Sequence, residues 1–272
     1  MSKAKECFVY NTKIIETPTT KEVYIYENPI FSHATEKADL EKTSKRKTFD
    51  EMSAHKQYDS LKRKQKHYEQ TRWEIARIVD CNFNNRTKFV TLTFKENIQD
   101  ITVTNKEFKY FIQRLNYSLY HTKIQTLKYI ATWEKQKRGA IHYHVIFFDF
   151  PFVAKEKLQD LWTYGFIKIN RIDVDSMENR GRYLSKYFGK DLELKEHKKK
   201  AFFKSQNLKM PIEQKLMLTD DILQDLTQEN VVFQKEYTRQ VYDTKSIITN
   251  GSPLKDSSVT YLKIKKGRDC TG

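Results

Sequence analysis

The sequence contains few of the residues that mark several protein classes. Glycine occurs 7 times, proline 5 times and cysteine 3 times among 272 residues. So little glycine and proline argues against a β-rich repeat array or a low-complexity chain. Cys7, Cys81 and Cys270 are too widely separated to form a CxxC zinc or redox motif. An odd cysteine count without a secretion signal suits a reducing cytoplasm.

Long hydrophobic runs are also missing. The longest apolar stretch covers residues 145–153, is interrupted by Asp149 and is far too short to cross a bilayer. The residues after Met1 show no apolar core of a signal peptide. We therefore expect a cytoplasmic protein without a membrane partner.

Positive charge and aromatic residues are plentiful instead. Lysine and arginine number 50 against 35 aspartate and glutamate residues, a formal charge of +15. Sixteen tyrosines and 17 phenylalanines are enough for a folded core, which excludes a wholly disordered basic tail. The charge indicates an anionic partner, nucleic acid before a membrane surface.

Hydrophobic periodicity from residue 88 onward predicts an α+β fold. A buried strand at 89–94 is followed by a helix after the capping-box spacing of Thr104 and Glu107. The further elements expected are a strand at 127–134, a turn at 137–140, a strand at 141–148, a helix at 155–162, a strand at 166–174 and a helix at 176–189. The first six form the split βαββαβ pattern of ferredoxin-like and RRM-like folds, with a four- to five-stranded antiparallel sheet.

His142 and His144 lie two residues apart in the strand at 141–148, so both imidazoles project from one face. Glu134 ends the preceding strand, and a hairpin would bring it beside them. One carboxylate and two imidazoles could hold Mg²⁺ or Mn²⁺ against a phosphodiester. The alternative is that the histidines merely pair with neighbours or water.

Tyr183 and Tyr187 lie four residues apart and share one face of the expected helix at 176–189. A tyrosine hydroxyl attacks a phosphate better when a metal and a nearby cation polarise it. Lys186 and Lys190 each follow a tyrosine by three residues and could supply that cation. The alternative is an aromatic stripe that packs the helix on the sheet.

Taken together, these segments resemble the rolling-circle replication initiators (Rep proteins) of the HUH endonuclease superfamily. The resemblance rests on Phe-Val-Thr-Leu-Thr-Phe at 89–94, Arg-Gly-Ala-Ile-His-Tyr-His at 138–144 and Tyr-Leu-Ser-Lys-Tyr-Phe-Gly-Lys at 183–190, and extends to a segment at 203–211. The YxxxYxxK form is similar to the two-tyrosine branch. Tyr143, between the histidines, is expected to face away from them, and the strand at 89–94 is given no chemical role.

The resemblance implies a DNA nicking endonuclease and strand transferase. Glu134, His142 and His144 would hold Mg²⁺ or Mn²⁺ at a single-stranded or hairpin origin. Tyr187 would attack first, giving a 5′-phosphotyrosine and a 3′-hydroxyl primer, and Tyr183 would act in the second round, although these roles could be reversed. Lys186 and Lys190 would assist. The DNA contacts assigned are Arg138, Lys62, Arg63, Lys64 and Lys66, the last four on a basic helical stretch that could equally be a solvated face.

The domain organisation expected is an N-terminal extension at 1–50, a basic helical segment at 51–87, the HUH catalytic domain at 88–200 and a C-terminal extension at 201–272 on or beside it. A strand is expected at 259–265. No GxxxxGK[ST] phosphate loop occurs, so a separate host helicase, with a host DNA polymerase, would have to act. The alternatives left open are a mobilisation relaxase, an HUH transposase and a non-catalytic RRM-like nucleic-acid-binding module.

Overall fold

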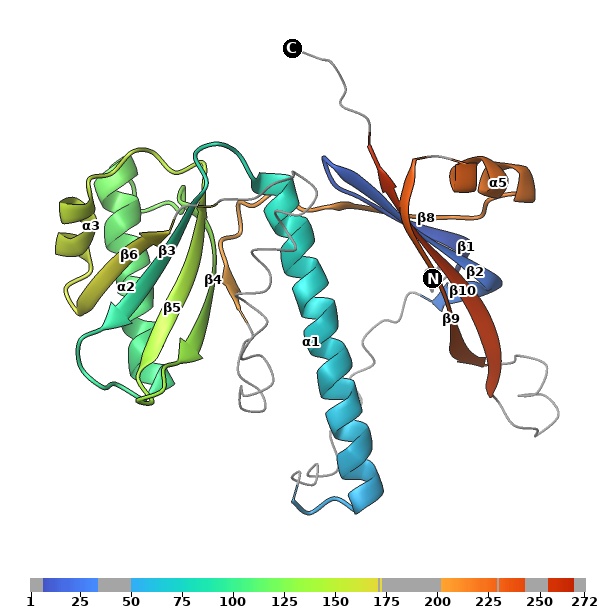
Figure 1. Ribbon diagram of the computed structural model, residues 1–272, viewed down its shortest axis with the longest axis horizontal. Coiled ribbons are helices and arrows are strands. Elements are labelled where there is room, and N and C mark those ends of the chain that lie inside the picture. Colours follow the sequence, from blue (N-terminus) through green and yellow to red (C-terminus); the bar gives the residue numbers. More distant parts are fainter. Residues whose placement is uncertain are drawn as a thin grey trace, which may run out of the picture. The chain divides into compact units, whose positions relative to one another are not determined.

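The computed structural model describes residues 7–33, 50–170, 172, 202–228, 230–242 and 254–266. The chain divides into two units (Figure 1). The central unit is Phe49–Met210, and the terminal unit combines Met1–Thr48 with Pro211–Gly272. Each unit contains one five-stranded antiparallel sheet, so the α+β class is confirmed.

The central unit follows the predicted order of strand, helix, strand, strand, helix and strand. These elements are β3 (Lys88–Phe94), α2 (Ile101–Tyr120), β4 (Lys128–Lys135), β5 (Ile141–Phe148), α3 (Lys155–Leu161) and β6 (Gly165–Asn170). The sheet order is β6-β3-β5-β4-β7, where β7 is the two-residue strand Phe203–Lys204. The two strands in the middle, β3 and β5, carry the Thr/Leu-rich and histidine motifs.

Both faces of the central sheet carry apolar residues, and different helices cover them (Figure 1). Side chains at alternate positions, among them Leu92, Tyr143 and Val145, pack with α2 and α3 in one core. On the opposite face, Ile146 and Phe148 pack with the last turns of α1 (Ala54–Asn82). Tyr143 thus faces away from the histidines, as predicted, and its hydroxyl donates to Asn105 at 2.7 Å.

The long helix α1 differs along its length. Its first turns are mostly exposed, whereas Ile75, Ile78 and Val79 near its end are buried on the sheet. The Asn82 side chain donates to the Lys209 carbonyl at 2.8 Å and accepts from the Lys209 N–H at 2.9 Å. This pair holds the segment after β7 against α1, where Leu208 completes the core.

Helix α2 begins three residues earlier than its capping-box pattern predicts. Asp100 is the N-cap, and its carboxylate accepts from the Thr102 N–H at 2.7 Å. Thr104 lies inside the helix, buried, with its hydroxyl donating to the Ile101 carbonyl. Aspartate and threonine are both good caps, and the burial of Ile101 and Thr104 selects the earlier start.

The terminal unit pairs strands from distant parts of the sequence. They are β1 (Cys7–Glu16), β2 (Thr20–His33), β8 (Ile212–Leu216), β9 (Val231–Tyr242) and β10 (Leu254–Lys265), in the order β8-β1-β2-β10-β9. Helix α5 (Asp220–Gln228) contributes Leu226 to a core with Ile14, Val23 and Leu262. The strand predicted at 259–265 lies in β10, whereas this second sheet was not predicted.

One buried side chain organises the loop between α2 and β4. The Asn116 amide donates to the carbonyls of Thr122 and Ile124, both at 2.9 Å. Its oxygen accepts from the backbone N–H groups of Thr126 and Leu127 at 2.9 and 2.8 Å. The amide therefore uses its full hydrogen-bonding capacity to fix the entry to β4.

Replacement of Asn116 should destabilise the central unit. Asn116→Ala leaves backbone groups of this loop without their partner, and we expect the free energy of unfolding to fall by about 2 to 4 kcal/mol. Denaturant unfolding followed by circular dichroism measures the change. Gln113→Ala, at an exposed position of the same helix, is the control. Equal losses for the two variants would contradict this role of Asn116.

Candidate metal centre

The hairpin between β4 and β5 places Glu134 opposite His142. The register pairs Glu134 with His142 and Thr132 with His144. In the turn, the Gln136 N–H donates to the Ala140 carbonyl and the Gly139 N–H to the Gln136 carbonyl, both at 2.8 Å. Gly139 has a φ of 87°, a conformation that side chains disfavour. A tight turn thus fixes the register that the site needs.

The three predicted ligands come together. Each of Glu134, His142 and His144 offers a donor atom, and these atoms lie within 4.8 Å of one another. The His144 Nε2 lies 2.9 Å from the Glu134 Oε1, and the His142 Nε2 is hydrogen-bonded to the same oxygen. Two imidazole nitrogens and one carboxylate oxygen around one point are a suitable donor set for a divalent cation. The cluster therefore fits a metal ion.

Two neighbours orient the ring of His144. The Thr91 hydroxyl lies 3.2 Å from the His144 Nδ1, which leaves the Nε2 directed at Glu134. The Phe89 ring stacks on the imidazole, with centroids 5.6 Å apart and an angle of 23° between the planes. Hydrogen bonds to the second nitrogen are the usual way in which proteins hold a metal-binding histidine. Sequence analysis missed Thr91, although strand alternation alone places it on the histidine face.

The environment keeps Glu134 ionised. Burial acts to raise the pKa of its carboxyl group, but hydrogen bonds from His142 and His144, together with their charges when protonated, outweigh burial. The net result is a pKa well below the ordinary value for glutamate. An ionised carboxylate is the form that binds a cation.

The cluster belongs to two rows of side chains that cross the sheet. One row is Phe166, Thr93, His142 and Glu134, and the next is Lys168, Thr91, His144 and Thr132. At the β6 end of these rows Lys168 is exposed, and the Phe166 side chain is 65% exposed. An aromatic ring and a cation thus share the sheet face of the metal ligands.

The other predicted site residues are distributed differently. Arg138, in the turn after β4, is exposed and donates to the carbonyls of Phe94 at 2.6 Å and Lys95 at 3.2 Å. It thereby ties the hairpin to the end of β3, and its contact with DNA stays a prediction.

The predicted basic cluster lies on α1. Lys62, Arg63 and Lys66 are exposed there, with Lys62 4.5 Å from the centre of the Tyr58 ring, and Lys64 belongs to the same helix. The predicted catalytic residues Tyr183, Lys186, Tyr187 and Lys190 lie outside the described residues. The roles of all eight residues stay predictions.

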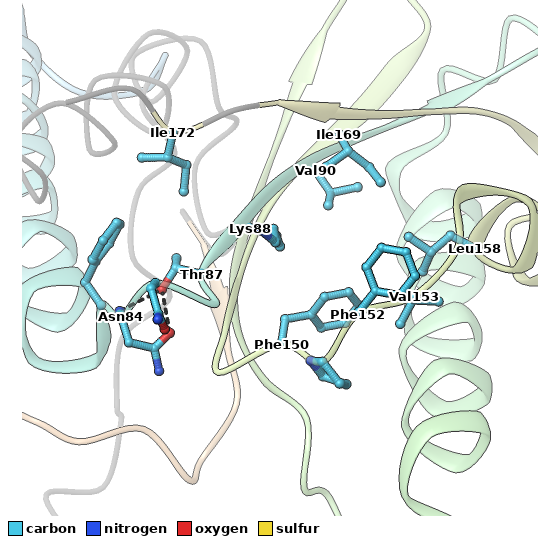
Figure 2. A pocket seen from close by; sticks show the side chains of 13 residues that line it. Asn84, Thr87, Lys88, Val90, Phe150, Phe152, Val153, Leu158, Ile169 and Ile172 are labelled. Atoms are coloured by element: carbon cyan, nitrogen blue, oxygen red, sulfur yellow. Dashed lines mark hydrogen bonds between the residues drawn. The ribbon is translucent and has the colours of Figure 1, made fainter.

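A pocket of about 590 Å³ lies at the opposite end of the strands from the metal cluster (Figure 2). It is lined mainly by apolar side chains, including Val90, Phe150 and Ile169, and Lys88 is the one ionisable residue among the described residues that line it. Such a lining offers neither a nucleophile nor a metal-binding group, so the chemistry belongs to the open sheet face. None of the helices in the described ranges is long and apolar enough to span a membrane.

Comparison with known proteins points to the segment that contains this cluster. Residues 87–192 match the model of a family described as replication-associated proteins of the ORF2 type. This segment is similar to replication-associated proteins. The chain is also 27% identical over 146 residues to the phasyl DNA replicon protein arp of Escherichia coli, covering 44% of this chain and 49% of that protein. The chain thus spans about half the length of this curated relative. No solved structure matches the chain significantly.

Removal of one ligand should abolish tight binding of Mn²⁺. Because His144 supplies one of three donors, we expect His144→Ala to weaken the binding of Mn²⁺ by at least about 100-fold. Titration followed by electron paramagnetic resonance of free Mn²⁺ measures this directly. His67→Ala, at an exposed position of α1, is the control, and thermal melting of both variants tests folding. A folded His144→Ala protein with wild-type affinity would contradict the metal site.

The Thr91 hydroxyl provides a finer test of the geometry. Thr91→Val keeps the shape of the side chain but removes its contact with the His144 Nδ1, so the affinity for Mn²⁺ should fall about tenfold. Thr93→Val is a matched control on the same strand and face, because within the described part of the chain the Thr93 hydroxyl makes no side-chain hydrogen bond. Equal effects of the two substitutions would show that Thr91 does not position the imidazole.

Proposed function

We propose that this protein initiates rolling-circle DNA replication as a metal-dependent nicking endonuclease of the HUH type. The observation that carries the proposal is the Glu134–His142–His144 cluster on an open sheet face, inside a segment similar to replication-associated proteins. The match and the similarity to a replicon protein support the role in replication. The cluster supports the chemistry.

The sheet order supports the HUH assignment. The first and third strands of the βαββαβ series, β3 and β5, lie in the middle, with β6 and β4 outside them. This is the strand order of the split βαββαβ frame. The histidines project from a central strand toward the face that α1 covers only in part. A frame of this kind serves many functions, so the side chains rather than the fold carry the proposal.

The residues of the cluster would hold Mg²⁺ or Mn²⁺ against the phosphate to be cleaved. When bound, such an ion polarises a phosphodiester and neutralises its developing charge. Glu134 contributes an ionised carboxylate, and His142 and His144 contribute their Nε2 atoms. Thr91 and Phe89 hold the ring of His144 in place.

The covalent step belongs to the tyrosine segment. The phenol oxygen of Tyr187 attacks the phosphorus, and the bond between the phosphorus and the 3′-oxygen breaks. The phenol proton is lost as the 3′-oxygen gains one, which leaves a 5′-phosphotyrosine and a 3′-hydroxyl primer. Lys186 and Lys190 would stabilise charge at the phosphate. In a second round Tyr183 cleaves the regenerated origin, and the new 3′-hydroxyl resolves the first linkage.

The substrate would be a single-stranded or hairpin origin lying across the open face. Lys168 and Phe166 share that face, and Arg138 lies in the turn beside Glu134. The exposed cations of α1 would add affinity that depends on salt. A separate host helicase and a DNA polymerase would complete the reaction. A relaxase or an HUH transposase would use the same chemistry on a different DNA.

A second candidate is a nucleic-acid-binding module without catalysis. The observation in its favour is the exposed Phe166 on the sheet face, because RNA-recognition domains stack bases on aromatic side chains at such positions. That module would not need three metal-binding side chains around one point. Covalent capture of DNA separates the two functions.

Tyr187→Phe should abolish covalent capture of a single-stranded origin oligonucleotide, because it removes the attacking oxygen. A denaturing gel with labelled DNA and Mn²⁺ shows the adduct. Tyr183→Phe should retain first-round capture, and His144→Ala should lose it while keeping DNA binding that weakens with salt. Capture by Tyr187→Phe but not by Tyr183→Phe would exchange the two roles. No adduct with wild-type protein would favour the binding module.

A further inference from the structure

A sheet face of the terminal unit carries five aromatic side chains. Val23 and Leu262 project toward α5, so the alternate residues of the same strands project from the opposite face. The register places Tyr261 beside Tyr24 and Val259 beside both Tyr26 and Tyr237. We call this surface the aromatic face; its rings are Tyr24, Tyr26, Phe233, Tyr237 and Tyr261.

The rings form a nearly continuous surface. The centroids of Tyr24 and Tyr261 are 4.9 Å apart, and those of Tyr261 and Phe233 are 6.1 Å apart. On the edge strand β9, Phe233 is 52% exposed and Tyr237 is 40% exposed. Folding thus leaves aromatic surface in contact with water beside rings that are partly buried.

Cations alternate with these rings. One row across the sheet reads Lys215, Lys13, Tyr24, Tyr261 and Lys235. A lysine therefore lies on each side of the two stacked tyrosines.

Two further cations belong to the same face. Lys263 projects beside Phe233, and the Arg239 guanidinium lies 5.5 Å from the centre of the Tyr26 ring. Aromatic rings interleaved with lysine and arginine are typical of surfaces that bind single-stranded nucleic acid.

Few negative charges oppose these five cations. Among the described residues of the face, the carboxylates are Glu22, which is buried, and Glu213, which forms an ion pair with Lys13 at 2.8 Å. Burial, with smaller contributions from Tyr10 and Tyr237, raises the pKa of Tyr26 to about 12. The phenols are uncharged at neutral pH, so the face keeps a positive excess.

We propose that the aromatic face is a second site for single-stranded DNA, with unpaired bases stacked on Phe233 and Tyr237 and phosphates bound by Lys235 and Arg239. These residues lie outside 87–192, the segment similar to replication-associated proteins. The site therefore does not depend on the metal centre. Its preference for DNA over RNA rests on the proposed function.

The chemistry favours a single strand over other partners. A duplex keeps its base faces stacked inside, so exposed rings gain little from it, whereas every unpaired base has a free face. A protein partner for the exposed apolar surface would gain nothing from the excess of lysine and arginine. Stacking and phosphate contacts use both features of the face.

The test compares two double variants of β9 in the full chain. Phe233→Ala with Tyr237→Ala removes the exposed rings, and Gln234→Ala with Thr238→Ala changes two exposed residues on the other face of the same strand. Fluorescence anisotropy with labelled 30-nucleotide oligo(dT) should show affinity reduced at least about tenfold by the first pair. The second pair should have little effect. Lys235→Glu should weaken binding and lower its salt dependence.

A second measurement locates the DNA. Photo-crosslinking of an iodouracil-substituted oligonucleotide, followed by mass spectrometry, should identify peptides of β9 or β10. The inference is overturned by wild-type affinity in both the Phe233/Tyr237 and Lys235 variants, or by crosslinks confined to residues 87–192. It is also overturned by tenfold tighter binding of oligo(U), or by a solution dimer that only the ring variant dissociates.

Failure of the proposed function would look different. If wild-type protein forms no covalent adduct but loses oligo(dT) affinity when the rings are removed, the nicking function is wrong and the aromatic face stands. If the adduct forms and the ring variant binds normally, the reverse holds.

Discussion

The pairing of Glu134 with His142 across one hairpin is the constraint on which the candidate site depends. A slip of one residue between β4 and β5 would move the carboxylate to the face packed by α2 and α3. The turn at Gly139 and the hydrogen bonds around it resist that slip. Arg138 adds a link from the turn to the backbone at the end of β3. The metal ligands are thus placed by backbone geometry before any ion binds.

The same face of the central sheet is divided between stability and chemistry. Toward one end, Ile146 and Phe148 are covered by α1, and toward the other, His142 and His144 are left for the site. Phe89 belongs to both parts, because it packs in the core under α1 and stacks on His144. Packing of α1 therefore reaches the metal ligand through a single aromatic side chain.

Local patterns predicted the central unit well because its elements are short and strongly periodic. The strand that contains His142, the hairpin and the Glu134 cluster follow from alternation and turn chemistry. The start of α2 was misjudged because Asp100 and Thr104 are competing caps, and burial decides between them. Thr91 was missed because its role lies in a contact with His144, fifty-three residues away.

The terminal sheet was beyond prediction from sequence pattern. Val23 to Tyr26 has β character, and so do Val259 to Lys265, but neither segment indicates its partner. Pairing of β2 with β10 joins residues more than 230 positions apart. The tertiary contacts of α5 and of five strands, rather than local propensity, define this unit.

This long-range pairing has a consequence for the order of events during synthesis. The hairpin of β1 and β2 is among the first segments to leave the ribosome, yet its neighbours β8 and β10 are made only after the whole central unit. The central unit can therefore fold while the early hairpin has two unsatisfied edges. A nascent chain would expose these edges to other chains until residue 265 has emerged. The terminal sheet is consequently the last part of the described fold to close.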